Sequence, residues 1–279
     1  TEKLWLSSIP DVIQLGGLIN KYNYKEEPYR IAPAIGEFDN PQQQKQGLLT
    51  VDLTGIGNLL IYGMAGTGKE NLLTTMIYSI CMNHSPEEVN IYILDYGAET
   101  LKIFNKYPHV GGIVTAEDSE QMLNILTLVD KEADRRKRLF VDYGGNYNNY
   151  IKESNEKLPL IVVVINYYEM FVEANARISE ALSTLIREGA KYGIVFVLTT
   201  AVNNSVNGRM TQLFLNKISF QQPDENAYRS LLSTPKGLYP KKYFGRGLAK
   251  VGEQFFEFQT AYITAKDKTN ALIRESAIE

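Results

Sequence analysis

The chain has 279 residues, a formal net charge of −3 and a pI of about 5.6. Its 44% hydrophobic and 22% charged residues are ordinary for a globular protein, and the length suffices for one large α/β domain. The mild acidity argues against a module dedicated to gripping a nucleic-acid backbone. The single cysteine, Cys81, excludes an internal disulfide and a cysteine-rich metal site.

The start of the chain and the lengths of its apolar runs indicate which cellular compartment to expect. It begins at Thr1 without a methionine or a signal-peptide pattern, so we expect a piece of a longer protein. Its longest apolar runs, Leu158–Ile165 and Ile194–Leu198, are far shorter than the roughly 20 residues that cross a bilayer. These features are typical of a cytosolic piece, whatever its parent protein does.

Strand-like and helical segments alternate along the chain, which predicts a mostly parallel sheet covered by helices. A Thr115-Ala-Glu-Asp118 capping box is expected to start a helix, in which apolar residues from Met122 to Ala133 recur at helical spacing. In chain order, the other expected elements are strand Asn58–Tyr62, helix Asn71–Met82, strands Val89–Leu94, Val110–Val114 and Leu160–Ile165, helix Ile178–Ala190, and strands Ile194–Thr199 and Phe255–Ala261.

A glycine-rich loop lies between the first expected strand and the helix after it. Glycines at this position let backbone N–H groups surround phosphate oxygens at a helix N-terminus, and a lysine then reaches the outer phosphates. The sequence therefore predicts a P-loop fold with a nucleotide-binding loop formed by Gly63, Met64, Ala65, Gly66, Thr67, Gly68, Lys69 and Glu70.

The last residue of this loop departs from the P-loop pattern. A serine or threonine hydroxyl normally binds magnesium there, and this chain has Glu70. Two unit charges about 4 Å apart repel by roughly 4 kcal/mol at an effective dielectric near 20, so a carboxylate facing a polyphosphate weakens its binding. One alternative is that Glu70 turns aside and neutralises Lys69.

The second magnesium element is also altered. The strand Leu160–Ile165 should be followed by an aspartate and then by an acid that orients water. The sequence has Asn166 and Tyr167 instead, and Glu169 two residues further on. These degenerate positions predict little or no hydrolysis, because an amide lacks the charge and a tyrosine is no base at neutral pH. The other reading is that Glu70 and Glu169 rebuild an unusual metal site.

Several motifs, read in order, resemble the FtsK/SpoIIIE-type ATPase modules of the membrane-bound type VII secretion ATPases, the EssC/EccC family. The resemblance spans nearly the whole chain. Besides the glycine loop, it rests on Leu4–Leu6, Ile35–Pro41, Ile93–Gly97, Pro108–Gly112, Ala133–Phe140, Arg187–Gly193 and Gly245–Leu248.

The resemblance implies a RecA-like P-loop NTPase fold in a cytoplasmic module of a bacterial protein anchored in the cell membrane. It implies three tandem modules, of which this one, with its altered Glu70, Asn166 and Tyr167, suits the last and most degenerate. The implied partners are secreted WXG100-type and other type VII substrates and the neighbouring ATPase modules of a hexamer, with no nucleic acid. ATP binding is expected to be weak or absent, with magnesium only where ATP binds.

Prolines and the polar run Gln42–Gln46 interrupt the first fifty residues. We therefore expect residues 1–57 to form an N-terminal extension that packs on the core. Residues 58–279 are expected to form the ATPase-like core with edge strands at its C-terminal end.

Other charged residues allow two readings each. Arg187, Arg209 and Arg246 are candidates for contacts between modules or for an arginine finger, with surface ion pairing as the alternative. The basic run Arg135–Arg138 ends a helix whose acids come first, which favours a solvated helix end over a nucleic-acid contact. No residues stand at metal-ligand spacing around His84 or His109, so no metal site is predicted.

The sequence thus favours a degenerate secretion-motor module that binds substrates and neighbouring modules. Two alternatives remain at this point. One is an active ATP-hydrolysing motor module, and the other is a DNA translocase module, against which the net acidity weighs.

Overall fold

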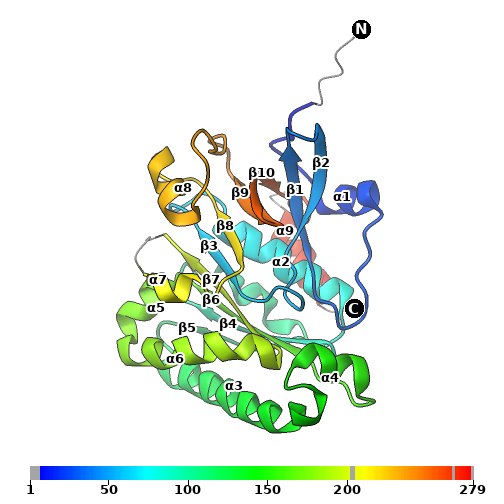
Figure 1. The fold of residues 1–279 in the computed structure, drawn as a ribbon, viewed down its shortest axis with the longest axis vertical. Helices are drawn as coiled ribbons and strands as arrows, with labels where there is room; N and C mark the ends of the chain where they lie inside the picture. The colour runs from blue at the N-terminus through cyan, green and yellow to red at the C-terminus, as the bar shows by residue number, and fades with distance from the viewer. Residues whose placement is uncertain (1–6, 202–204, 266–267, 278–279) are drawn as a thin grey trace.

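The computed structural model describes residues 7–201, 205–265 and 268–277. Within them, ten strands form one sheet in the order β2-β1-β10-β9-β8-β3-β7-β6-β4-β5 (Figure 1). Neighbours from β8 to β5 are parallel, and the strands on the β2 side are antiparallel. The strands are β1 (Ala34–Asn40), β2 (Lys45–Thr50), β3 (Leu59–Tyr62), β4 (Val89–Asp95), β5 (Val110–Thr115), β6 (Leu160–Asn166), β7 (Ile194–Thr200), β8 (Asn216–Ser219), β9 (Arg246–Val251) and β10 (Gln254–Thr260).

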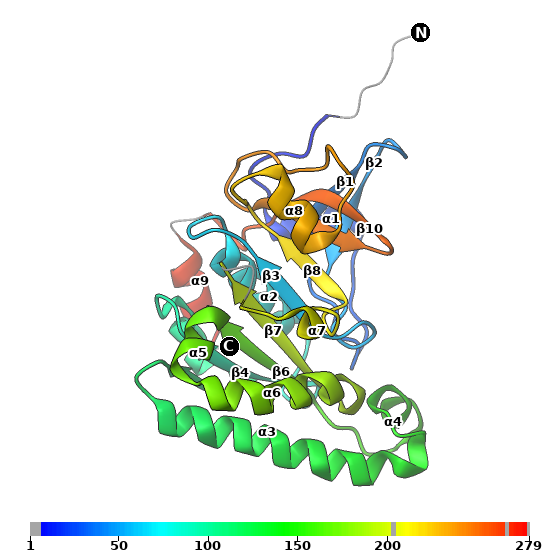
Figure 2. The same cartoon turned by 60° about the vertical axis from the view of Figure 1, so that its left-hand side comes forward.

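Helices cover both faces of the sheet (Figure 2). One apolar core joins α2 (Lys69–Asn83), α4 (Tyr147–Glu153), α9 (Thr269–Ser276) and the 3-10 helices η1 (Thr100–Lys106) and η2 (Phe140–Tyr143) to one face. A second core joins the remaining large helices to the other face: α3 (Ser119–Leu139), α5 (Tyr168–Ala174), α6 (Ala176–Gly189), α7 (Gly208–Thr211) and α8 (Glu225–Leu232). The 3-10 helix η3 (Ala190–Tyr192) connects α6 to β7.

The central strands explain why the order of elements was predictable. Every residue of β6 and β7 is buried, as expected of strands covered on both faces. The expected elements from Asn58 to Ala261 are confirmed, and apart from the start of α3 their boundaries differ by about two residues at most. The prediction of a mostly parallel sheet flanked by helices is therefore confirmed.

The N-terminal segment enters the sheet itself. Strand β1 pairs with β10, and β2 pairs with β1, so residues 34–50 extend the sheet at its antiparallel edge. Helix α1 (Leu15–Tyr22) packs in a separate apolar cluster with Ala34 and Ala261. The segment therefore shares hydrogen bonds with the core in addition to packing on it. The motif Leu4–Leu6 lies outside the described residues.

Two predictions about α3 are wrong. The helix begins at Ser119 after Asp118, and the residues of the expected capping box lie before it without a side-chain cap bond. Of the basic run, Arg136 is buried instead of solvated, with only 1% of its surface exposed. Its guanidinium donates to the Pro159 and Tyr192 carbonyls at 2.6 and 3.0 Å and to Glu132 at 2.9 Å. It thereby joins α3 to the segments that enter β6 and β7.

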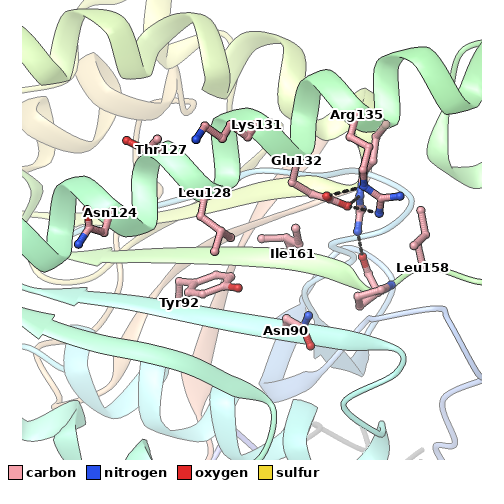
Figure 3. Close-up of a pocket in the computed structure, with 12 residues that line it drawn as sticks. Asn90, Tyr92, Asn124, Thr127, Leu128, Lys131, Glu132, Arg135, Leu158 and Ile161 are labelled. Carbon is pink, nitrogen blue, oxygen red and sulfur yellow. Dashed lines mark hydrogen bonds and ion pairs between the residues drawn. The ribbon is translucent and has the colours of Figure 1, made fainter.

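A surface cavity of about 720 Å³ lies beside this junction. Figure 3 shows Leu128 of α3 facing Tyr92 and Ile161 of the strands. The cavity lies toward the amino ends of β4 and β6, the edge opposite to the glycine loop. It is therefore not part of the predicted nucleotide site. Among the described residues, no helix is long and apolar enough to cross a membrane.

A buried histidine ties the N-terminal segment to the core. The two ring nitrogens of His84 contact Glu88 at 2.9 Å and Glu26 at 3.0 Å. These carboxylates also accept backbone N–H groups of Tyr29 and Ala32. Burial lowers the pKa of His84, but the two carboxylates raise it by more, so the net direction is upward.

Replacing Arg136 by alanine should destabilise the fold by about 3–5 kcal/mol, because Glu132 and the carbonyls of Pro159, Tyr192 and Gly193 lose a buried charged donor. Urea unfolding measures the change. The adjacent Arg135→Ala is the matched control, since Arg135 contacts only Glu132 in the described contacts and its side chain is 51% exposed. We expect the control to cost no more than about 1 kcal/mol. Equal losses for both variants would contradict the anchoring role of Arg136.

The His84 cluster predicts a pH dependence of stability. Because the pKa of His84 is higher in the folded protein than its unfolded value of about 6.5, the histidine stabilises the fold fully below about pH 6.5. This stabilisation is lost as the pH rises through the folded pKa. The difference in unfolding free energy between wild type and His84→Gln should be about 1–3 kcal/mol near pH 6 and shrink toward pH 9. Burial lowers the pKa of His109, so His109→Gln should show no such decline. A difference for His84→Gln that is constant with pH would refute the idea.

Candidate nucleotide site

The glycine loop connects β3 to α2 at the carboxyl edge of the parallel strands. Gly66 and Gly68 have φ of 74° and 124°, which favour glycine. A Cβ on Gly68 would lie 2.9 Å from Cα of Gly245, and the Gly245 N–H donates to the Thr67 carbonyl at 3.0 Å. The Thr67 hydroxyl donates to the Met64 carbonyl at 2.7 Å. The sequence thus folds into the compact loop that the motif predicts.

Lys69 is folded back onto this loop. Its side chain is buried, and its ammonium donates to the carbonyls of Gly63 and Met64. Burial lowers the pKa of Lys69, and the carboxylates of Glu169 and Glu70 offset part of this effect. No carboxylate of the described residues lies within 4 Å of the ammonium. The alternative that Glu70 neutralises Lys69 directly is therefore wrong.

Glu70 instead turns toward the segment after β4. One carboxylate oxygen accepts a hydrogen bond from the Thr100 hydroxyl at 2.8 Å. The other lies 3.5 Å from the side-chain nitrogen of Asn166, at the limit of a hydrogen bond. Thr100 was not a candidate in the sequence, because nothing local links it to the glycine loop thirty residues earlier.

Asn166 is the centre of the site. It is fully buried, and its side-chain N–H donates to Asp95 at 3.0 Å. Its side-chain oxygen accepts the Thr199 hydroxyl at 2.7 Å. Asp95 also accepts the backbone N–H groups of Gly97 and Leu101 at 3.0 and 3.3 Å. The carboxyl ends of β4, β6 and β7 are thereby cross-linked through side chains.

Tyr167 adopts a left-handed backbone conformation with φ of 59°. Its N–H donates to the Thr199 hydroxyl at 2.9 Å, and its ring lies 5.7 Å from the Lys69 ammonium. A Cβ on Gly97 would lie 2.5 Å from this ring, so Gly97 is needed for the close approach. Burial and then the carboxylates of Glu70, Glu169 and Asp95 raise the pKa of Tyr167, which excludes a phenolate base at neutral pH.

Glu169 lies at the start of α5, near enough to influence Lys69. One of its oxygens accepts the Ala201 N–H at 3.3 Å. Its other oxygen is buried without a partner among the described residues. The structure therefore brings Lys69, Glu70, Asn166, Tyr167 and Glu169 to one edge of the sheet.

These residues fit a phosphate better than a magnesium ion. The glycine loop offers backbone N–H groups and Lys69, as a phosphate requires. Two of the possible metal ligands already have protein partners, since Glu70 accepts from Thr100 and the Asn166 oxygen accepts from Thr199, whereas one Glu169 oxygen has no partner among the described residues. No group of three or more metal-ligating side chains with metal-site geometry occurs among the described residues.

The candidate arginines separate into two kinds. Arg187 and Arg209 are exposed, as contacts between modules require. Arg246 is buried, with 2% of its surface exposed, and donates to Gln259, Glu257 and the Ile9 carbonyl. It is therefore an internal anchor: the ion pair of the alternative reading exists, with Glu257 at 3.1 Å, but the arginine is buried and does not lie at the surface.

Comparison with known proteins identifies the family. The model of the FtsK/SpoIIIE family matches residues 21–222. The chain belongs to the FtsK/SpoIIIE family. The ESX secretion system protein YukB of Bacillus subtilis (strain 168) is 29% identical over 199 residues, which cover 71% of this chain and 13% of YukB. The type VII secretion system protein EssC of Staphylococcus aureus (strain MRSA252) is 22% identical over 265 residues, covering 92% of this chain and 18% of that protein.

Solved structures show the same fold. EssC (ATPases 2 and 3) from Geobacillus thermodenitrificans superposes with a TM-score of 0.86 at 21% identity, covering 98% of this chain and 51% of that chain. Thermomonospora curvata EccC (ATPases 2 and 3), solved in complex with a signal sequence peptide, superposes with a TM-score of 0.80 at 23% identity, covering 91% and 47%. The chain is thus an FtsK/SpoIIIE module with a RecA-like P-loop fold, similar to modules of type VII secretion ATPases. It spans less than a fifth of the two secretion proteins compared above.

The contacts of Asn166 predict how much stability is lost when the aspartate that is usual at this position is restored. Asn166→Asp would replace the donor to Asp95 by a second buried carboxylate about 3 Å away, which raises the pKa of one of them. A carboxyl group whose pKa is higher in the folded than in the unfolded protein destabilises the fold at any pH above the unfolded pKa. The variant should therefore lose about 2–4 kcal/mol of stability at pH 7 and recover part of this loss near pH 4. Urea unfolding at both pH values measures this. The exposed Asn105→Asp is the control, and an equal loss there would contradict the pairing.

Proposed function

We propose that this module is a degenerate member of a type VII protein secretion motor, with weak or absent ATP binding and little or no hydrolysis. In the proposal, it binds secretion substrates, including small WXG100-type proteins, and the neighbouring ATPase modules of a hexamer. Its setting would be the cytoplasmic part of a membrane-anchored protein. The observation that carries the proposal is the side-chain network in which Glu70 and Asn166 bind Thr100, Asp95 and Thr199.

The chemistry of the network explains why ATP should bind weakly. A magnesium ion would need an oxygen from position 70 and another from the end of β6. Glu70 brings a negative charge instead of a hydroxyl, and Asn166 brings no charge. Repulsion between Glu70 and a phosphate of roughly 4 kcal/mol is an upper estimate at an effective dielectric near 20. Without the bridging ion, the Lys69 ammonium must also leave two carbonyls before it can bind phosphate.

The fold itself does not exclude a nucleotide. The pCW3 conjugation coupling protein TcpA, whose structure was solved with ATPγS, superposes with a TM-score of 0.75 at 21% identity. The proposed loss of activity therefore rests on side chains at the site. The binding role is supported by the resemblance to EccC, which was solved with a signal sequence peptide.

An active ATPase is the second candidate, and one observation favours it. Glu169 has a buried oxygen without a partner among the described residues. Burial lowers the pKa of Lys69 in the glycine loop, and the Glu169 carboxylate offsets part of this effect, as expected of an acid near bound phosphates. Turnover that Lys69→Ala abolishes would establish this candidate in place of the first.

An ATP titration with and without magnesium tests the proposal. We expect the wild type to bind weakly and magnesium to make little difference. Glu70→Thr should tighten binding about tenfold or more, because repulsion is removed, and the double change with Asn166→Asp should make binding depend on magnesium, because metal ligands are restored. Lys69→Ala is the control for use of the glycine loop. Tight, magnesium-dependent binding that is equal in wild type and variants would overturn the proposal.

A further inference from the structure

The segment between α8 and β9, residues 233–245, differs in charge from the rest of the chain. It carries three lysines, Lys236, Lys241 and Lys242, and no acidic residue, whereas the whole chain has a net charge of −3. All three lysines are exposed, and no described carboxylate lies within 4 Å of their ammonium groups. We call residues 233–245 the lysine–tyrosine loop. Both overall views show it at the top of the molecule, far from α3 (Figures 1 and 2).

The same loop exposes large aromatic side chains. Tyr239, Tyr243 and Phe244 are 57%, 47% and 39% exposed. Isolated apolar residues on a surface are normal, but here three exposed aromatic rings lie within six residues of one loop. Aromatic residues are enriched at the centres of protein interfaces, and lysines suit their polar rim.

The loop is also held in one shape. The Gly237 and Lys241 N–H groups donate to Glu225 and Glu257 at 2.6 and 2.9 Å. The Arg246 guanidinium lies 5.3 Å from the centre of the Tyr243 ring. The carboxylates of Glu225 and Glu257 thus accept backbone N–H groups of the loop, and the lysine side chains form no ion pair in the described contacts. A loop fixed before binding loses little conformational freedom when a partner docks.

The end of the loop rests on the glycine loop. Gly245 donates its N–H to Thr67 at 3.0 Å, and its Cα would lie 2.9 Å from a Cβ on Gly68. The two loops are therefore in direct backbone contact. A partner on the lysine–tyrosine loop would therefore act directly on the phosphate-binding backbone.

We propose that the lysine–tyrosine loop is a docking surface for a polypeptide segment that carries carboxylates beside leucine or aromatic side chains. The carboxylates bind Lys236, Lys241 and Lys242, and the apolar groups cover Tyr239 and Tyr243. Docking stiffens residues 63–68 through Gly245. This inference deepens the proposed binding role and does not depend on how weakly ATP binds.

Single-stranded nucleic acid is the rival occupant, since it also uses lysine and stacked aromatic rings. The observations favour a polypeptide. A pocket beside the loop, lined by its Ser233, Pro235 and Leu238, has the carboxylate of Glu253 in its wall and none of the three lysines, which does not suit a phosphate backbone. The module as a whole is also acidic.

The test uses a fluorescein-labelled peptide that alternates Glu-Glu with Leu or Phe, and the same peptide with Gln for Glu. Fluorescence anisotropy on the whole chain, without nucleotide, should show binding of the acidic peptide that weakens with salt. The triple change Lys236→Gln, Lys241→Gln and Lys242→Gln should weaken it about tenfold. The matched control changes Lys131, Lys137 and Lys152, exposed lysines of α3 and α4, to Gln and should stay within about twofold, because these charges lie outside the contact.

A second readout tests the link to the glycine loop. Hydrogen exchange at residues 63–68 should slow when the acidic peptide binds and should not change in the triple variant. Equal binding of both peptides, equal losses in the two triple variants, or tighter loop-dependent binding of oligo(dT) would each overturn the proposal. None of these outcomes bears on the ATP titration, which uses other variants, so the two proposals fail separately.

Discussion

The hydrogen bond between the buried Asn166 amide and the Asp95 carboxylate is the interaction on which the site depends. The two residues end adjacent parallel strands and face each other in register. One neutral donor and one charged acceptor can share this buried position, whereas two carboxylates repel unless a cation lies between them. Asn166 therefore gives the strand ends a stable arrangement that needs no metal ion.

The neighbouring residues follow from that arrangement. The Asn166 oxygen takes the hydroxyl hydrogen of Thr199, which leaves the Thr199 oxygen free to accept the N–H of Tyr167. Tyr167 then enters α5 in a left-handed conformation, which costs roughly 1–2 kcal/mol for a residue with a Cβ. Its ring fills the space over Gly97 and faces Lys69. A single amide thus decides which side chains surround the phosphate-binding loop.

The sheet was predictable because its signals are local. Continuous apolar runs such as Leu160–Ile165 allow few structures other than a buried strand, and the glycine motif fixes the turn after Tyr62. Contacts between distant segments were not predictable. Thr100 meets Glu70, Gly245 meets Thr67, and Arg136 reaches the Pro159 carbonyl only after the sheet has assembled. The N-terminal strands were not predicted for the same reason, because β1 pairs with β10, which lies more than two hundred residues later.

A glycine-rich loop is usually taken as a sign of nucleotide binding, but here protein packing alone requires two of its glycines. A Cβ on Gly63 would lie 2.8 Å from the Phe220 Cβ, and one on Gly68 would meet the backbone of Gly245. Substitution at either position would disturb the sheet whether or not ATP binds. The glycines can therefore persist for packing reasons, whichever residues stand at the positions that usually bind magnesium. The discriminating positions are then Glu70 and Asn166, because their side chains contact Thr100, Asp95 and Thr199 instead of shaping the glycine loop.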